Sequence, residues 1–320
     1  MIPNEWIYES AERIQGKIDK TPVTFAQELN AYLKWENEQK TGAFKIRGAL
    51  NKILTLAPWE QERGLVAASA GNHGLGVAYA ANLVGAKATV FIPEETAKNK
   101  EEAIVGYGAT IHKIAGHYSQ AELEAQNFAV KRGSTWISPY NDGQIIAGQA
   151  TLGLELIEQI APFDADACLV PVSGGALLSG IGLAFRSKGI TTKIIGVQAK
   201  NSSYFHSLYH LGLIKNVIET KSVADGLTGG VEKNSITIPL VRSMADDIVL
   251  VSEEEIEHAI AYVWYHYKVL IEGSAAVPVA AILNKKVNVI KPILILSGSN
   301  IQKIYHKDIC ERWKDRVLNK

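Results

Sequence analysis

Short apolar runs typical of buried strands alternate along this chain with longer stretches whose apolar residues recur at helical spacing. The runs predict strands at residues 32–36, 65–69, 88–93, 109–114, 168–172, 193–199, 248–251 and 292–296. The longer stretches predict helices at residues 5–17, 74–83, 97–105, 119–131, 144–160, 177–185, 253–267 and 301–317. Ser252, followed by Glu255, predicts a capping box where the helix at 253–267 begins. Alternation of this kind favours parallel sheets that helices cover on both faces.

The predicted strands fall into two groups, and each group is expected to form its own sheet. One group lies within residues 55–142, and the other follows residue 165. We expect the segment before residue 55 to pack on the second, larger sheet. The sequence therefore predicts a large domain of residues 1–54 and 143–320, with a smaller domain of residues 55–142 inserted into it.

Composition narrows the possible classes of function. The 320 residues are 47% hydrophobic and 21% charged, which is ordinary for a globular protein. The formal net charge is zero, so no basic field would attract nucleic acid or anionic lipid. The longest apolar run, residues 275–283, contains a proline and is far shorter than the ~20 residues of a membrane span. With two cysteines and no cationic, apolar leader, we expect a cytoplasmic protein without a disulfide framework.

The turn at residues 173–177, Ser-Gly-Gly-Ala-Leu, is the strongest local signal for a ligand site. It follows the apolar run 168–172 and opens a predicted helix. Glycine lets several backbone N–H groups point at one anion, and the helix dipole adds positive potential there. A phosphate group would fit this turn, although a tight strand-to-helix connection also favours glycine. A nucleotide P-loop is disfavoured because no Gly-Lys-Ser or Gly-Lys-Thr triplet closes the turn.

Three further segments could share one cleft with this turn. Residues 69–74 (Ser-Ala-Gly-Asn-His-Gly) and 297–300 (Ser-Gly-Ser-Asn) each follow a predicted strand, and the carboxyl ends of parallel strands are where ligand sites form. For the first of them, a simple helix cap by Asn72 is an equally good reading. Lys45 lies in the third segment, 41–49, and desolvation or a nearby cation would lower its pKa. A phosphorylated cofactor that carries an aldehyde would use all four segments.

These segments resemble those of the pyridoxal-phosphate enzymes of fold type II, the tryptophan-synthase β fold. Within that fold, the chain is most similar to the threonine/serine dehydratase and serine racemase group. The likeness runs over nearly the whole chain and rests on the motifs TGAFKIRGA, SAGNHGxG, IAGQxT, PVSGG, ADG, LIExSA and LSGSN. It implies an α/β fold of two open, twisted, mostly parallel sheets flanked by helices. It also implies pyridoxal 5'-phosphate as cofactor, a small amino acid as substrate, and a homodimer.

The resemblance implies a role for each residue that matches a motif. Lys45 would hold the cofactor covalently and move the Cα proton of the substrate. The cofactor ring would be surrounded by Phe44, Asn72, Gly226, Glu272 and Ser297, with Asn72 at the 3-oxygen and Ser297 at the pyridine nitrogen. The phosphate would be bound by backbone N–H groups of Ser173, Gly174, Gly175, Ala176 and Leu177. The substrate would be held by Ser69, Ala70, Gly71, His73 and Tyr140.

The implied activity is that of an L-threonine/L-serine dehydratase, an ammonia-lyase that removes the β-hydroxyl and yields a 2-oxo acid and ammonia. A hydroxyl from Ser297 at the pyridine nitrogen, in place of a carboxylate, favours elimination over transamination. Serine racemases of the group carry a serine where this chain has Ala70, and alanine cannot move a proton. Tyr140 resembles the aromatic residue of the dehydratases. Gln198 and Tyr204 occupy the positions of the group's divalent-cation ligands, so no metal site is expected.

Two alternatives stay open at this stage. The chain could be a serine racemase or an eliminase of another hydroxy or β-substituted amino acid. It could also be a non-catalytic sensor that binds pyridoxal phosphate or a nucleotide. Threonine and serine are not separated by the sequence, because one methyl group in an apolar pocket is worth about 1–3 kcal/mol.

Overall fold

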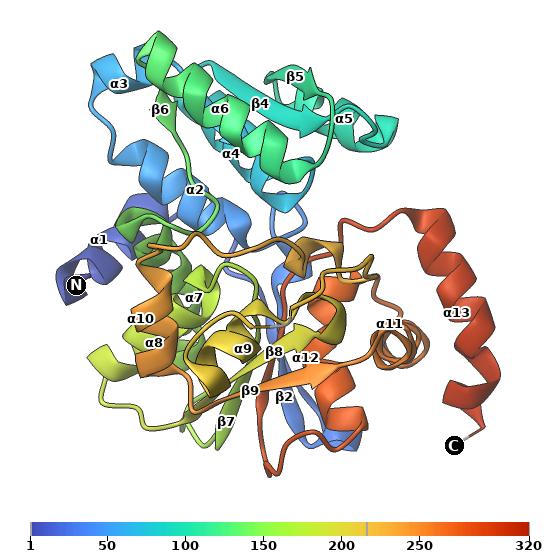
Figure 1. Ribbon diagram of the computed structural model, residues 1–320. Helices are drawn as coiled ribbons and strands as arrows, with labels where there is room; N and C mark the ends of the chain where they lie inside the picture. The colour runs from blue at the N-terminus through green and yellow to red at the C-terminus, as the bar shows by residue number, and fades with distance from the viewer. Residues whose placement is uncertain (1, 216, 320) are drawn as a thin grey trace.

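The chain folds around two separate sheets, each with helices on both faces (Figure 1). A computed structural model describes residues 2–215 and 217–319, so the outermost positions of the predicted 1–54 and 143–320 segments lie outside it. The six-stranded sheet has the order β1-β2-β10-β7-β8-β9, and the four-stranded sheet has the order β5-β4-β3-β6. All pairings are parallel except that of β1 with β2. The predicted α/β class with two mostly parallel sheets is confirmed.

The strands lie where the apolar runs predicted them, with two additions. The six-stranded sheet is formed by β1 (Val23–Ala26), β2 (Ala31–Trp35), β7 (Ala167–Pro171), β8 (Lys193–Ala199), β9 (Asp247–Val251) and β10 (Ile293–Leu296). The four-stranded sheet is formed by β3 (Leu65–Ala68), β4 (Ala88–Pro93), β5 (Thr110–Ile114) and β6 (Thr135–Trp136). The two strands without a sequence prediction, β1 and β6, are short and lie at sheet edges, where little apolar surface is needed.

The structure contains all eight predicted helices close to their predicted bounds, together with others that the sequence did not predict. In chain order, the helices are α1 (Asn4–Ile14), α2 (Lys45–Leu54), α3 (Pro58–Glu62), α4 (Asn72–Val84), α5 (Lys98–Gly106), α6 (Tyr118–Arg132), α7 (Gly143–Gln159), α8 (Ala176–Ser187), α9 (Tyr204–Leu211), α10 (Thr237–Met244), α11 (Glu253–Tyr267), α12 (Gly273–Leu283) and α13 (Lys303–Leu318). Short 3-10 helices, η1 to η4, lie at Gln27–Leu29, Glu36–Glu38, Lys200–Ser202 and Asp225–Leu227. The capping box of α11 is confirmed, since Ser252 and Glu255 bond each other's backbone N–H groups.

Several helices, among them α2, α10 and α12, have no counterpart among the predicted helices, and the reason is clearest for α12. Its residues are apolar on every side, so no helical periodicity is visible in the sequence. The structure explains the pattern, because α12 packs beneath β7, β8, β9 and β10 and is covered by α11. A helix that is buried all round is expected to be apolar all round.

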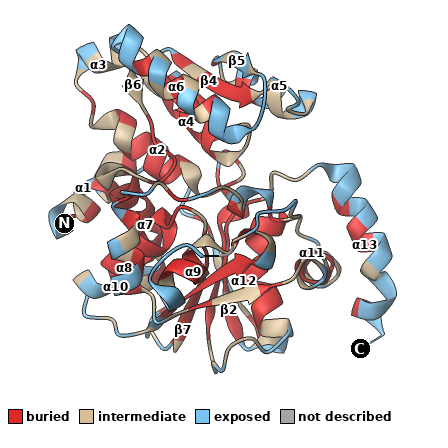
Figure 2. Cartoon of the chain, in the orientation of Figure 1, coloured by how far each residue is buried: buried red, intermediate tan, exposed pale blue. Residues whose placement is uncertain are grey.

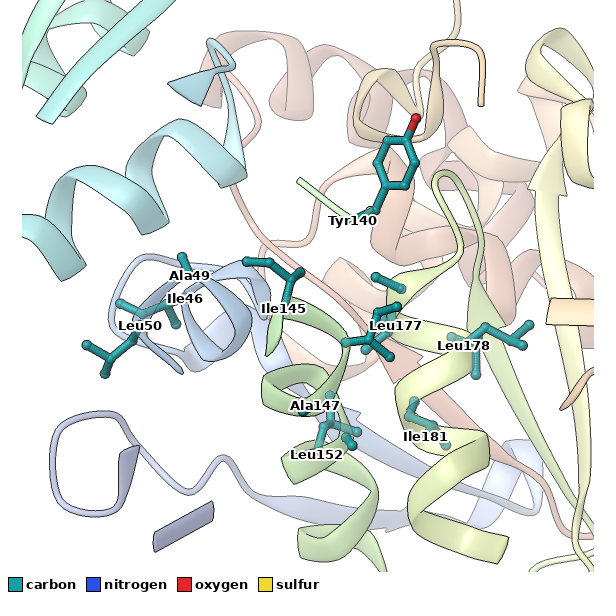
Figure 3. Packing of buried hydrophobic residues seen from close by; sticks show 14 of the residues in the cluster. Ile46, Ala49, Leu50, Tyr140, Ile145, Ala147, Leu152, Leu177, Leu178 and Ile181 are labelled. Carbon is teal, nitrogen blue, oxygen red and sulfur yellow. The ribbon is translucent and has the colours of Figure 1, made fainter. Parts of the chain in front are cut away.

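The core divides into layers that Figure 2 makes visible as buried strands between partly exposed helices. One face of the six-stranded sheet packs on α12, which is covered by α11 and then α13, and the other packs on α7 and α8. This second layer is continuous with α2 and α4, so one apolar cluster joins the two sheets. Figure 3 shows Ile46, Ala49 and Leu50 of α2 beside Ile145 of α7, with Leu177 of α8 beyond them.

Candidate cofactor site

Lys45 is the first residue of α2, and its side chain reaches the segment between β6 and α7. Its Nζ donates to the backbone carbonyl of Pro139 at 2.9 Å and lies 5.3 Å from the centre of the Phe44 ring. Other side chains cover Lys45 only partly, but it lies deep enough for protein to replace much of the surrounding water. This desolvation lowers the pKa of Lys45 to about 8. The amine is therefore far easier to deprotonate near neutral pH than an ordinary lysine.

The turn between β7 and α8 presents a row of unpaired backbone donors. Within residues 2–215 and 217–319, the N–H groups of residues 173–177 have no hydrogen-bond acceptor. Gly175 is the N-cap of α8 with a φ of 85°, a conformation that favours glycine. A Cβ on Gly174 would lie 2.2 Å from Cγ of Tyr140, and one on Gly175 would lie 2.7 Å from Val241. Free donors at a helix N-terminus, with side chains excluded, fit a phosphate group.

A second helix N-terminus lies in the turn between β3 and α4. The hydroxyl of Ser69 accepts from the Gly71 N–H at 3.1 Å and so fixes the turn. The N–H groups of residues 72–74 have no acceptor among the residues that the structure describes. The side chain of Ala70, also in this turn, is partly buried. A carboxylate is the matching guest for these donors.

His73, in the first turn of α4, is buried and uncharged. Its Nε2 lies 2.8 Å from the carbonyl of Ile137, which makes Nε2–H the donor. Burial, and then the charge of Lys45, lower the pKa of His73 to about 3. His73 and Lys45 are thus close enough for the charge of one to influence the other.

Asn72, Glu272 and Asn300 form a hydrogen-bonded cluster from three separate elements. Asn72 Nδ2 donates to Glu272 Oε1 at 2.7 Å, and Asn300 Nδ2 donates to Asn72 Oδ1 at 2.6 Å. The backbone N–H of Asn300 donates to Glu272 Oε2 at 2.9 Å. Burial, and then the charge of Asp225, raise the pKa of Glu272 to about 7. The cluster fixes Asn72 so that only one of its amide hydrogens is committed.

Gly226 and Ser297 complete the surroundings expected for a cofactor ring. A Cβ on Gly226 would lie 3.9 Å from Glu272 Oε1, so Gly226 borders the carboxylate. Ser297 follows β10, and its carbonyl accepts from the Phe44 N–H at 3.1 Å. Ser297 is buried. Because Phe44 caps α2, this backbone bond ties the position of Ser297 to that of Lys45.

Tyr140 covers the 173–177 turn from the side of α7. Its hydroxyl accepts from the Glu232 N–H at 2.9 Å, and Figure 3 shows that hydroxyl pointing away from the apolar cluster. Asn141 Nδ2 donates to Glu232 Oε2 at 2.6 Å, so the loop around Glu232 is anchored beside the site. Burial raises the pKa of Tyr140. Two shallow surface hollows, lined in part by Lys113 and by Trp59, share no residue with this site.

The structure thus links the sequence-predicted site residues through direct contacts, and it adds residues that the sequence did not indicate. Asn300 was visible as part of the LSGSN motif, but nothing marked it as the partner of Asn72. The Pro139 carbonyl and Glu232 gave no signal, because backbone acceptors and long-range pairs leave no local pattern. An amine of lowered pKa, a turn of unpaired N–H groups and the serine that follows β10 together fit a phosphorylated aldehyde cofactor such as pyridoxal phosphate.

Gln198, expected in place of a metal ligand, has two protein partners. Its Nε2 donates to the Val172 carbonyl at 3.2 Å, and its Oε1 accepts from the His206 N–H at 2.7 Å. Among the described residues, no group of three or more His, Cys, Asp or Glu side chains is arranged to hold a metal ion. Along the same part of the chain, no helix combines the length and apolarity that a membrane crossing requires.

Comparisons with known proteins agree with this geometry. Residues 14–298 match the family described as pyridoxal-phosphate dependent enzyme. The L-threonine ammonia-lyase of Geobacter sulfurreducens is 39% identical over 311 residues, covering 94% of this chain and 76% of the relative. That of Thermotoga maritima is 38% identical over 328 residues, covering 100% of this chain and 79% of the relative.

Solved structures show the same fold. Maize serine racemase is 30% identical with a TM-score of 0.89, covering 98% of each chain. The processed form of threonine deaminase isoform 2 from Solanum lycopersicum is 27% identical with a TM-score of 0.87, covering 97% of this chain and 88% of the other. The chain therefore belongs to the pyridoxal-phosphate dependent enzymes and has their type II fold.

Proposed function

We propose that this enzyme is an L-threonine and L-serine dehydratase. It removes the α-proton and the β-hydroxyl of the amino acid, and the product hydrolyses to a 2-oxo acid and ammonia. The observation that carries the proposal is the partly buried Lys45 amine, with a pKa of about 8, beside two turns of unpaired N–H groups. Relatives called L-threonine ammonia-lyase, similar over most of the chain, support the same reaction.

Each part of the cleft has a task in this reaction. The N–H groups of residues 173–177 would bind the cofactor phosphate, and those of residues 72–74 would bind the substrate carboxylate. The bound cofactor supplies an electron sink for the pair released when the Cα–H bond breaks. Lys45 Nζ would take up that proton, because a pKa near the working pH suits a general base.

The Ser297 hydroxyl would set the character of the cofactor ring. A hydroxyl can donate or accept a hydrogen bond, so it does not hold a proton on the pyridine nitrogen as a carboxylate would. Phe44 and the fixed amide of Asn72 would orient the ring from its other edges, with Glu272 and Gly226 beside them. A ring that withdraws electrons only moderately favours rapid loss of the β-hydroxyl.

A serine racemase is the second candidate, and the fold of maize serine racemase supports it. Racemisation needs a proton donor on each face of Cα. Ala70 supplies none from the substrate turn, so we propose that elimination dominates. The family match favours an enzyme over a sensor without catalytic activity.

The proposal extends to the assembly and location of the enzyme. We propose a cytoplasmic homodimer, which the resemblance to the dehydratase group supports. Exposed apolar side chains such as Ile218 and Ile304, at 80% and 79% accessibility, are surfaces that a second copy could cover. The bounds 55–142 for the smaller domain agree with the strands of the four-stranded sheet and stay a proposal for limited proteolysis to test.

A substrate panel tests the proposed activity. Purified protein with pyridoxal 5'-phosphate is incubated with L-threonine, L-serine, D-serine and hydroxyaspartate, and 2-oxo acid and ammonia are measured. From L-threonine and from L-serine, we expect 2-oxo acid and ammonia in equal amounts. We expect chiral analysis to show no D-serine. D-serine formed as fast as the 2-oxo acid would establish the racemase instead. Absence of ammonia from every substrate would refute the dehydratase.

A further inference from the structure

The helix that begins with Lys45 carries a second cation on its opposite side. Successive helical residues are about 100° apart, so Arg47 points about 200° away from Lys45. The Arg47 side chain is completely buried, and so is that of its partner Glu36. Glu155 of α7, 17% exposed, is the second carboxylate partner. None of these charges lies at the cofactor site described above.

Every N–H of the Arg47 guanidinium has an acceptor. Nε and Nη2 donate to the two oxygens of Glu36, each at 2.8 Å. Nη1 and Nη2 donate to the two oxygens of Glu155 at 2.7 and 2.9 Å. Nη1 also donates to the Thr151 hydroxyl at 3.3 Å. A guanidinium has five N–H groups, so this set leaves none unpaired, and no other side chain could make it.

Lys34 of β2 balances the remaining charge. Its Nζ donates to Glu155 at 2.6 Å, to the Thr21 carbonyl at 2.8 Å and to Gln159 at 2.9 Å, which uses its three hydrogens. Two cations and two carboxylates therefore form a neutral network. The network joins β2, η2, α2 and α7 at one point.

The location of the network matters more than its contribution to stability. A buried ion network costs desolvation energy, and apolar residues of similar volume often stabilise a fold equally well. Such a network instead defines one arrangement, because every bidentate bond fails when a helix turns or slides. On α7, the network sits downstream of Pro139, whose carbonyl accepts from Lys45. Arg47 therefore joins the helix that begins with Lys45 to the helix that begins four residues after Pro139.

Close backbone packing makes α2 sensitive to this anchor. A Cβ on Gly48 would lie 2.8 Å from the Ile145 carbonyl, and one on Gly148 would lie 2.6 Å from the Arg47 carbonyl. Helices this close leave no space in which α2 could adjust independently. A displacement of about 1 Å at a reacting group can cost about 10²-fold in rate.

We propose that Arg47 is a positioning residue for Lys45, in that its fully paired guanidinium fixes the rotation of α2 and thereby the place of the Lys45 amine. This inference rests on the proposed role of Lys45 as the group that binds the cofactor. It assigns Arg47 no contact with substrate or cofactor.

Two variants of the full chain test the inference. Arg47→Lys keeps the charge but loses both bidentate pairs, whereas Lys34→Met removes a cation from the same network without touching α2. Each protein, freed of bound cofactor, is treated with pyridoxal 5'-phosphate and borohydride between pH 6 and 10. Mass spectrometry then gives the fraction of Lys45 that carries a pyridoxyl group. Circular dichroism and thermal unfolding report the fold.

We expect R47K to lower labelling of Lys45 at limiting cofactor by about tenfold or more, and to lower kcat more than it raises KM. K34M should lower the melting temperature but label like the wild type. Equal labelling of R47K and wild type would overturn the inference alone. Loss of folding in R47K while K34M stays folded would also overturn it, because Arg47 would then be purely structural. If wild-type Lys45 is not labelled at all, the proposed function itself fails.

Discussion

The cations on the two sides of α2 differ in how many hydrogen-bond acceptors surround them. On the cleft side, the Lys45 amine has one acceptor, the carbonyl of Pro139, and nearby turns present N–H groups without partners. On the network side, Arg47 and Lys34 have an acceptor for every N–H. Unpaired donors in a buried place are costly unless a ligand satisfies them. The contrast distinguishes the side of the helix where donors lack partners from the side where every donor of the two cations is paired.

Lys45 and Lys34 show the same contrast within one residue type. Burial lowers the pKa of Lys34, but Glu36 and Glu155 act against it and favour the charged form. Lys45 has no carboxylate to oppose desolvation, and its pKa falls to about 8. About a tenth of such an amine is uncharged at pH 7, against less than one in a thousand for an ordinary lysine. Lys45 is easier to deprotonate because it is desolvated without a carboxylate nearby. The carboxylates beside Lys34 favour its charged form, so Lys34 is a structural cation.

Substituting each of the two lysines separately should distinguish an effect on activity from an effect on stability. The loss of activity is the largest effect that we expect. Lys45→Ala removes the proposed general base and the cofactor's attachment, so turnover of L-threonine should fall by about 10⁴-fold or more. Its melting temperature should change little. Lys34→Met leaves a buried carboxylate short of one partner and should destabilise the fold by about 3–5 kcal/mol. Its kcat should stay near the wild-type value.

Turnover assays and urea unfolding of the two variants check this pair. A K45A protein that still turns over L-threonine at the wild-type rate would contradict the assignment of Lys45. Equal losses of activity in both variants would show that the two sides of α2 are not separable.

The cleft side was largely predictable from the sequence, and the network side was not. The turns at 69–74, 173–177 and 297–300 are local motifs at the ends of apolar strands, and parallel topology brings such ends together. Lys45 lies in a local motif of its own, at the start of α2. The network joins Lys34, Glu36, Arg47 and Glu155, which are separated by up to 121 residues along the chain. No periodicity or spacing rule connects residues that far apart. Each of them alone looks like an ordinary surface charge.

Packing of backbone against backbone was also invisible in the sequence. No local pattern indicated that neighbours occupy the space of a Cβ at Gly48, Gly148 and Gly174, as the structure shows. The buried helix α12 was missed for a related reason, since its surroundings are apolar on all sides. The periodicity of apolar residues arises where one side of a helix or strand faces the core and the other faces water. It is therefore absent from a helix that is buried on all sides.

Adding one methyl group to the 173–177 turn should weaken cofactor binding and leave the Arg47 network unchanged. We expect this effect to be intermediate in size. In Gly174→Ala the new Cβ would lie 2.2 Å from Cγ of Tyr140, so the ring or the turn must move. Overpacking of this kind costs about 1–3 kcal/mol. We expect about a tenfold to 10²-fold weaker affinity for pyridoxal 5'-phosphate, measured by fluorescence titration. Gly106→Ala, where a Cβ meets nothing within 4 Å, is the control and should leave the affinity unchanged. Unchanged affinity in G174A would argue against phosphate binding by this turn.

The smallest expected effect concerns His73, which responds to the uncompensated charge of Lys45. Burial and that charge lower the pKa of His73 to about 3, whereas a histidine in the unfolded chain titrates near 6.5. The native state therefore binds fewer protons than the unfolded state between these values. The stability that depends on neutral His73 is complete above about pH 6.5 and is lost as the pH falls toward 3, with a slope of at most about 1.4 kcal/mol per pH unit.

Urea unfolding at pH 7.5, 6 and 5 measures this slope in the wild type and in two variants. In His73→Gln, an amide N–H can still donate to the Ile137 carbonyl, so the stability lost between pH 7.5 and 5 should be smaller by about 1–2 kcal/mol. The exposed His117 provides the control, since His117→Gln should follow the wild-type curve. Lys45→Ala should also flatten the curve in part, because it removes the charge that disfavours protonation of His73. If the stability of Lys45→Ala falls with pH as steeply as that of the wild type, burial alone keeps His73 neutral. The charge of Lys45 then has no effect on the pKa of His73.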